Sequence, residues 1–134
     1  MKRIMLILMI LAILSIGISA GFAKDTLNST DDFTEAINQA QSENKNIVLI
    51  FDQDSCVYCD ILKENTLADE KVIDELNTNY ILVIVNVNEE PELAAKYNVY
   101  GTPLTVILDS NQNQIGRIEG YVDADEFLEM LQGV

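Results

Sequence analysis

The sequence predicts a single α/β domain in which helices cover both faces of a central mixed sheet. Two unbroken runs of β-branched and apolar residues, 47–51 and 80–87, are typical of buried strands, and helical patterns separate them, as parallel strands require. Two later strand-like segments, 104–108 and 115–118, flank a short polar stretch and predict an antiparallel hairpin. With 134 residues, 6 Gly and 2 Pro, the chain has the size and composition of one globular domain.

The elements of this domain follow from helical spacing and turn residues. The first helix is expected to be capped by Ser29 or Thr30 and to run to about Ser42, before strand 47–51. Cys56 begins a second helical stretch, which residues 66–69 interrupt. The helical pattern resumes over 69–77.

The second half of the chain supplies the remaining strands. Strand 80–87 leads to a short helix over 92–97, because Pro91 fits a first helical turn. The hairpin follows, and Asp123 then caps a final helix. The predicted order is α-β-α-β-α-β-β-α, with helices on both faces of the sheet.

The N-terminal 23 residues predict export. Lys2 and Arg3 precede an apolar run over 4–23, and Gly21 and Ala23 occupy the −3 and −1 positions of a signal-peptide cleavage site. The segment is either a signal peptide cleaved after Ala23 or an uncleaved anchor, since about 20 apolar residues can span a bilayer. Both alternatives place the rest of the chain outside the cytoplasm. Residues 24–30 are expected to be a linker and 31–134 the folded domain.

Composition excludes several classes of function. The chain has 22 acidic and 8 basic residues, a net charge of −14, and such a chain repels nucleic-acid backbones. It has no histidine, which excludes Ser-His-Asp and Cys-His nucleophile systems and histidine-ligated metals. The chemistry must come from carboxylates, hydroxyls or the two cysteines. We expect a monomer that needs no cofactor or metal.

The Cys56-Val57-Tyr58-Cys59 motif lies just beyond strand 47–51, at the sheet edge where functional groups gather. A two-residue spacer brings both sulfurs within bonding distance, and the helix N-terminus stabilises the Cys56 thiolate. The motif therefore predicts redox chemistry in which Cys56 attacks and Cys59 resolves.

Two other interpretations of the cysteine pair stay open at this point. One is a zinc site shared between molecules, since one chain offers only two cysteines. The other is a structural disulfide, although closing so short a loop contributes only about 2 kcal/mol. A haem attachment site is excluded, because Asp60 and not histidine follows the second cysteine.

A second motif places a proline at the entry of a strand, in the segment Val99-Tyr100-Gly101-Thr102-Pro103-Leu104-Thr105. Taken alone, this motif is also explained by an ordinary trans proline that begins a strand. Together with the strand ending at Phe51, the C-x-x-C helix, the segments 83–88 and 90–103, and Gly120-Tyr121, it resembles the thioredoxin superfamily over 31–132. The sequence is most similar to extracytoplasmic members of the SoxW type, which carry a C-x-Y-C motif.

The resemblance implies a thioredoxin-like fold with a cis Thr102–Pro103 bond packed against a redox-active Cys56–Cys59 disulfide. Thr102 and Pro103, with Val57 and Tyr58, would contact protein disulfide substrates. The implied activity is thiol-disulfide exchange outside the cytoplasm, in the direction of reduction, which requires a membrane-bound thiol electron donor. A disulfide oxidase or isomerase and a non-catalytic binding module remain alternatives.

The chain also departs from thioredoxins proper. Ser55 stands where they have Trp, and Val57-Tyr58 where they have Gly-Pro. Their buried Asp and its Lys partner fall on Ile50 and Ile84, so the usual proton acceptor of the resolving cysteine is missing. Asp52, Asp54 or water could replace it, and the alternative for both acids is that they are polar residues of an exposed turn.

The charges near the motif predict the direction of exchange. No Lys, Arg or His lies between Lys45 and Lys63, so Asp52, Asp54 and Asp60 oppose the helix N-terminus. We therefore expect the pKa of the attacking thiol to stay near that of an ordinary cysteine. A protein of this kind favours its disulfide form and acts as a reductant.

Overall fold

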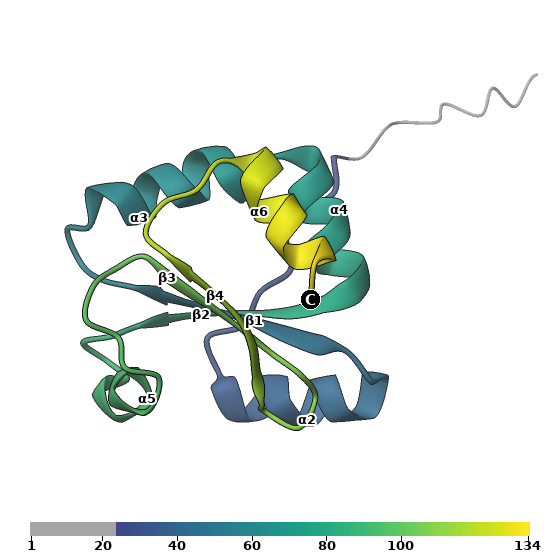
Figure 1. The fold of residues 1–134 in the computed structure, drawn as a ribbon, viewed down its shortest axis with the longest axis horizontal. Helices are drawn as coiled ribbons and strands as arrows, with labels where there is room; N and C mark the ends of the chain where they lie inside the picture. The colour runs from purple at the N-terminus through teal and green to yellow at the C-terminus, as the bar shows by residue number, and fades with distance from the viewer. Residues whose placement is uncertain (1–23) are drawn as a thin grey trace, which may run out of the picture.

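A computed structural model describes residues 24–134 as a four-stranded mixed sheet with helices on both faces (Figure 1). The strands lie in the order β2-β1-β3-β4, with bounds Asn46–Asp52 for β1, Tyr80–Asn86 for β2, Leu104–Leu108 for β3 and Gln114–Glu119 for β4. β1 and β2 are parallel, and the other pairs are antiparallel. The predicted fold class is confirmed, hairpin included.

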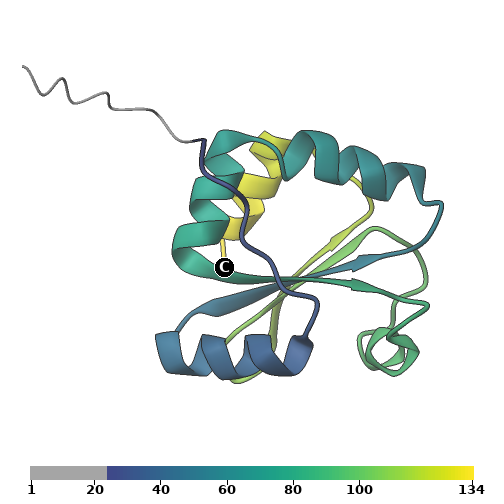
Figure 2. The ribbon, with the colours of Figure 1, turned by 180° about the vertical axis from the view of Figure 1, so that it is seen from behind.

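Two layers of helices enclose the sheet (Figures 1 and 2). One face carries α2 (Phe33–Glu43) and α5 (Pro91–Lys96). The other face carries α3 (Val57–Ile61), η1 (Leu62–Thr66), α4 (Glu70–Asn79) and α6 (Ala124–Gln132). The predicted signal or anchor segment lies outside the described residues. Within 24–134, no helix is both long enough and apolar enough to cross a membrane.

β1 is buried on both faces because its side chains alternate between two cores. Ile47, Leu49 and Phe51 belong to the core that α2 and α5 cover. Val48 and Ile50 belong to the opposite core, to which η1, α4 and α6 contribute. A strand buried in this way fixes the position of the segment that follows its last residue, and that segment carries the cysteine motif.

The start of the first helix differs from the sequence-based prediction. Asp32, and not Ser29 or Thr30, is the N-cap of α2, and its carboxylate accepts a hydrogen bond from the Glu35 N–H. Thr30 is unavailable as a cap because its backbone pairs with β2 beside Val83. Tertiary pairing thus moves the helix start beyond Thr30.

Residues 26–30, which we call the N-terminal strap, are bound to the domain, although a linker is predicted there. The Asn77 side chain donates to the Thr26 carbonyl and accepts from the Asn28 N–H, both at 2.9 Å. The Thr30 N–H donates to the Leu82 carbonyl at 3.0 Å. The strap therefore crosses the outer edge of β2 (Figure 2).

The helix after the cysteine motif changes its hydrogen-bond pattern one turn along. Residues Leu62–Thr66 form a π-helical turn, in which the Leu67 N–H donates to the Leu62 carbonyl five residues earlier. Buried Thr66 donates through Oγ1 to the Val122 carbonyl at 2.6 Å. The interruption predicted at 66–69 is present, but the π-helical turn before it is not predicted.

Candidate active site

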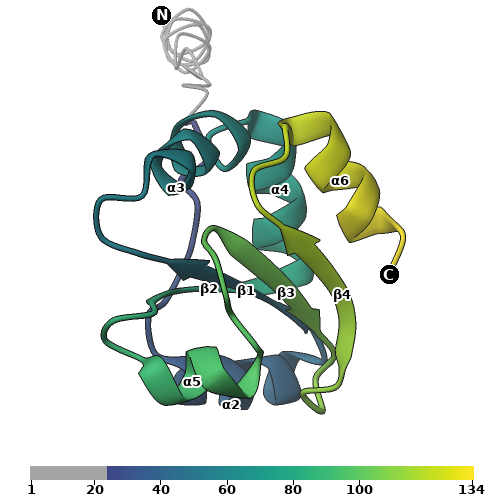
Figure 3. The same ribbon diagram turned by 60° about the vertical axis from the view of Figure 1, so that its left-hand side comes forward.

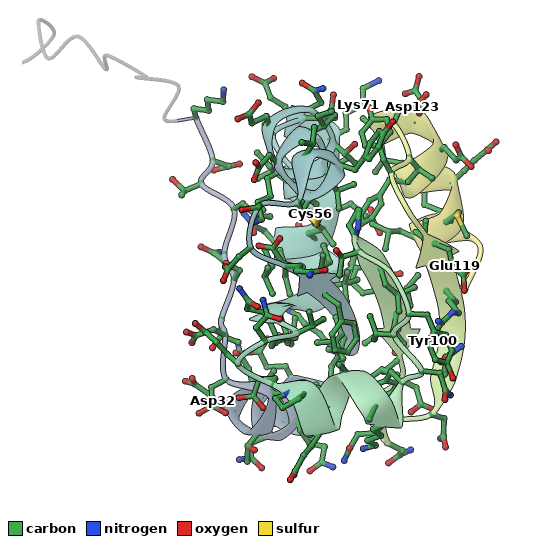
Figure 4. All side chains as sticks on the ribbon, turned by 90° about the vertical axis from the view of Figure 1, so that its left-hand side faces the viewer. Asp32, Cys56, Lys71, Tyr100, Glu119 and Asp123 are labelled. Carbon is green, nitrogen blue, oxygen red and sulfur yellow. A yellow bond between two sulfur atoms is a disulfide. The ribbon has the colours of Figure 1, made fainter. Side chains whose placement is uncertain are left out.

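Two loops meet near the carboxyl end of β1, the side of the molecule that Figure 3 brings forward and Figure 4 faces. One is the segment between β1 and α3, which ends at Cys56. The other is the loop before β3, which contains Thr102 and Pro103. The Gly120 N–H at the end of β4 donates to the Pro103 carbonyl at 2.9 Å, which fastens the second loop to the hairpin.

The two cysteines form a disulfide, with an S–S distance of 2.15 Å and a Cα–Cα distance of 5.2 Å. Cys56 is the N-cap of α3, and its Sγ accepts a hydrogen bond from the Cys59 N–H at 3.2 Å. Cys59 is 1% exposed, whereas Cys56 is half-buried. A reacting group can therefore reach Cys56 but not Cys59.

The Thr102–Pro103 peptide bond is cis, as expected, and this loop packs against the disulfide. Thr102 Oγ1 lies 3.4 Å from Cys56 Sγ and 3.3 Å from Gln53 Oε1. Ser55, next to Cys56, adopts the left-handed region with a φ of 58°, a conformation that non-glycine residues rarely adopt. The structure thus brings Thr102 of the second motif to Cys56 of the first.

Apolar side chains stand exposed at the start of α3 and in the loop before β3. Val57 is 68% exposed, Tyr58 62% and Tyr100 94%. Beside Tyr100, a groove of about 220 Å³ runs along Thr102 and Pro103 to the end of β4. Large apolar groups exposed together are typical of surfaces that bind other proteins.

The charges of the site are not distributed as the sequence predicts. Asp52, whose side chain is 18% exposed, pairs with the Lys63 ammonium of η1. The expectation of an uncompensated Asp52 carboxylate is therefore wrong, and the reason is that helical spacing places Lys63 one turn beyond Cys59. Asp54 accepts a hydrogen bond from the Asn86 side chain at 2.8 Å.

Ile50 and Ile84, the positions expected to replace the ion pair of thioredoxins proper, lie side by side in the sheet. They are partners in the parallel register of β1 and β2, and both lie in the core on the α3 side of the sheet. Among residues 24–134, no cluster of three or more His, Cys, Asp or Glu side chains is suited to hold a metal ion.

The sequence model of the thioredoxin-like domain matches residues 33–134, most of the chain. The chain belongs to the thioredoxin-like domain family. Among curated relatives, this thioredoxin-like domain is 36% identical over 98 residues to the thiol:disulfide interchange protein DsbD of Yersinia pestis, covering 69% of the chain and 16% of that protein. It is 28% identical over 106 residues to the DsbD of Campylobacter jejuni, covering 76% and 18%. The chain thus spans less than a fifth of the relatives' length.

Solved structures of thioredoxin-like domains have the same fold. A thioredoxin from Thermus thermophilus superposes with a TM-score of 0.74 and 28% identity, covering 81% of this chain and 87% of that one. The oxidised C-terminal domain of DsbD from Neisseria meningitidis superposes with a TM-score of 0.66 and 23% identity, covering 79% and 98%. The latter likeness shows the fold alone.

Sequence reasoning missed two residues of this thioredoxin-like site. Lys63 lies four residues after Cys59, a helical spacing that could have indicated a shared face. Gln53 gave no signal, because its contact with Thr102 depends on how the β1–α3 loop folds back toward a residue 49 positions away.

Proposed function

We propose that this protein is a thiol-disulfide oxidoreductase that reduces protein disulfides outside the cytoplasm. The observation that carries the proposal is the asymmetry of the cysteine pair, in which Cys56 is reachable and Cys59 is buried behind it. A structural disulfide needs no such asymmetry, whereas an exchange reaction needs one sulfur to attack and a second to be shielded.

The exchange reaction proceeds in two steps. With the pair reduced, the Cys56 thiolate attacks one sulfur of a substrate disulfide, and the other substrate sulfur leaves as a thiol after taking up a proton. Cys59 then loses its proton and attacks Cys56, which releases the second substrate thiol and closes the Cys56–Cys59 disulfide. Two electrons pass to the substrate, and a thiol donor must supply them again for the next cycle.

The hydrogen bond from the Cys59 N–H to Cys56 Sγ fits the first of these steps. The N–H is directed at the sulfur that carries negative charge in the reduced protein, at a donor–acceptor distance of 3.2 Å. Hydrogen bonds to charged acceptors are about twice as strong as those between neutral groups. Backbone donation at the helix start therefore favours the Cys56 thiolate.

The exposed side chains around the disulfide form the proposed substrate surface. Val57 and Tyr58 flank Cys56 on one side, and Thr102 and Pro103 face it from the other. Tyr100 extends this surface along the groove before β3. An extended substrate segment lying between these loops would bring its disulfide to Cys56.

Location, electron donor and oligomeric state belong to the same proposal. The apolar run over 4–23 after Lys2 and Arg3 supports export or anchoring. The curated relatives are thiol:disulfide interchange proteins, which supports a role in thiol-disulfide exchange. The proposed electron donor is a membrane-bound thiol, because net reduction outside the cytoplasm needs an external source of electrons. The finer assignment to SoxW-type proteins and the monomeric state stay predictions.

The proposal is tested by trapping. Cys59→Ser should accumulate mixed disulfides through Cys56 when expressed in the native host, because the second step is blocked. Cys56→Ser, the matched control, should accumulate none. Mixed disulfides through Cys59 in the Cys56→Ser protein would reverse the assignment of roles.

A dithiol titration separates the alternatives. Labelling of free thiols before and after mild treatment with a small dithiol should show the pair opening and closing. A disulfide that stays closed would contradict the proposal and leave a binding module. Recovery of native pairing from a scrambled substrate without net reduction would indicate an isomerase.

A further inference from the structure

Thr102 faces two hydrogen-bond acceptors with a single proton. Its Oγ1 lies 3.4 Å from Cys56 Sγ and 3.3 Å from Gln53 Oε1. A hydroxyl group carries one proton and can donate it to only one of them at a time. The stronger acceptor therefore determines where the Thr102 hydroxyl points.

The oxidation state of Cys56 changes which acceptor is stronger. In the disulfide, Cys56 Sγ is a neutral and weak acceptor, so the amide oxygen of Gln53 is the better partner. A dithiol that reduces the pair breaks the S–S bond with two electrons and closes to its own disulfide. Of the two thiol protons that the dithiol gives up, one is taken up by Cys59 and the other passes to solvent when Cys56 is a thiolate. That thiolate is an anionic acceptor and a stronger one than a neutral amide oxygen.

We propose that Gln53 is a positioning residue that switches the Thr102 hydroxyl between these two acceptors. In the oxidised protein, the Gln53 amide oxygen accepts the Thr102 proton. In the reduced protein the amide turns by roughly half a turn, its nitrogen donates to Thr102 Oγ1, and the hydroxyl proton points at Cys56. The oxygen and nitrogen of an amide occupy nearly equivalent positions, so this change needs no movement of the backbone.

The β1–α3 loop holds Gln53 in place for this role. The Gln53 N–H donates to the Asp52 carboxylate at 2.8 Å, and Lys63 holds the same carboxylate from η1. The hydrogen bonds of the described residues join the Gln53 side chain to Thr102 and not to Cys56. Gln53 therefore acts on the Cys56 sulfur only through Thr102. The inference rests on the proposed function, because the thiolate that Gln53 stabilises is the one that attacks the substrate disulfide.

Other charged and titratable groups lie in the segments around the site as well. They are Asp52 and Asp54 before Cys56, Tyr58 and Asp60 in α3, Lys63 in η1, Tyr100 before β3, and Glu119 and Tyr121 at the end of β4. Their influence is the same in two proteins that differ only at Gln53. A comparison of matched variants therefore isolates the contribution of the amide.

The test is a double-mutant cycle on the reduced full chain, with Gln53→Ala, Thr102→Val and the double variant. Iodoacetamide labelling of Cys56, located by mass spectrometry, is followed against pH. Gln53→Ala should slow labelling at pH 7 about threefold and move the midpoint of the profile up by about half a pH unit, because water replaces part of the lost hydrogen bond at an exposed residue. In the Thr102→Val background, the same change should alter the rate by less than about 1.5-fold.

Two further variants control this cycle. Thr102→Ser keeps a hydroxyl and should retain the full effect of Gln53→Ala. Gln114→Ala removes an exposed glutamine at the opposite end of the sheet, where Gln114 pairs with Leu108, and should leave the profile unchanged.

Two outcomes would overturn the proposal. One is an equal effect of Gln53→Ala with and without the Thr102 hydroxyl, and the other is no effect in the wild-type background. Both outcomes differ from the result expected if the proposed function is wrong. In that case, the wild-type disulfide would not exchange with a small dithiol.

Discussion

Two buried tyrosines allow a test of the energetic reasoning, because they differ mainly in whether their hydroxyl groups have partners. Tyr80 and Tyr97 are each 7% exposed. The Tyr80 hydroxyl donates to the Leu131 carbonyl at 2.6 Å, which joins β2 to the end of α6. The Tyr97 hydroxyl is buried without a partner among the described residues.

The expected effects of removing each hydroxyl have different sizes. Tyr80→Phe leaves the buried Leu131 carbonyl without its partner and should lower the free energy of unfolding by about 1 to 2 kcal/mol. Tyr97→Phe removes an unpaired polar atom and keeps the ring, which packs edge-on against Phe33 at 6.2 Å between centroids. It should change the free energy of unfolding by less than about 0.5 kcal/mol, or raise it.

Denaturant unfolding of the oxidised protein measures both changes, with thermal unfolding as a second readout. At about 4 °C per kcal/mol for a domain of this size, Tyr80→Phe should lower Tm by about 4 to 8 °C, and Tyr97→Phe should leave it unchanged or higher. Equal losses of unfolding free energy in the two variants would refute the reasoning. The Tyr97 hydroxyl would then make a hydrogen bond that stabilises the protein as much as the one to the Leu131 carbonyl.

Three further predictions concern pH, substrate contact and redox potential. Burial raises the pKa of both tyrosines, so the folded protein keeps phenolic protons that the unfolded chain releases. The contribution of the two tyrosines to stability should be constant below about pH 10 and be lost as pH rises toward the folded pKa values, and replacing both by Phe should flatten this alkaline fall in denaturation at stepped pH. Tyr100→Ser should slow reduction of a peptide disulfide several-fold by raising KM, whereas Ile115→Ser, an exposed apolar control on β4, should not; equal losses would remove Tyr100 from the substrate surface. The reduction potential of the Cys56–Cys59 disulfide, measured in thiol-disulfide buffers, should lie well below the roughly −120 mV of a strong oxidase. Lys63→Met should lower this potential further, because it leaves the Asp52 carboxylate uncompensated. A wild-type value near −120 mV would reverse the proposed direction of exchange.

Features encoded in consecutive residues could be predicted from the sequence. The unbroken apolar run of β1 predicts a strand buried on both faces, and the Cys56 and Cys59 spacing predicts their pairing. Asp123 was predicted as a cap because the acidic residues and apolar spacing of its helix are local. These assignments needed no knowledge of the rest of the chain.

Features that depend on contacts between distant residues could not be predicted. The cap of α2 shifts to Asp32 because Thr30 pairs with β2, 53 residues further along the chain at Val83. Gln53 reaches Thr102 only after the sheet brings β3 beside β1. For the helix cap, the local preference was correct in kind and a long-range contact decided the position, whereas Gln53 had no local signal at all.

The N-terminal strap has a consequence for solubility. β2 is an edge strand with the apolar sequence Tyr-Ile-Leu-Val-Ile-Val, and a bare edge of this kind can recruit a strand from another molecule. Thr30 occupies the middle of that edge, and Asn77 holds the residues before it in place. The strap therefore covers this edge and blocks the addition of a strand from another molecule. A shortened chain that starts at residue 31 would keep both cysteines and the whole sheet, yet it would present an open edge and be prone to aggregation.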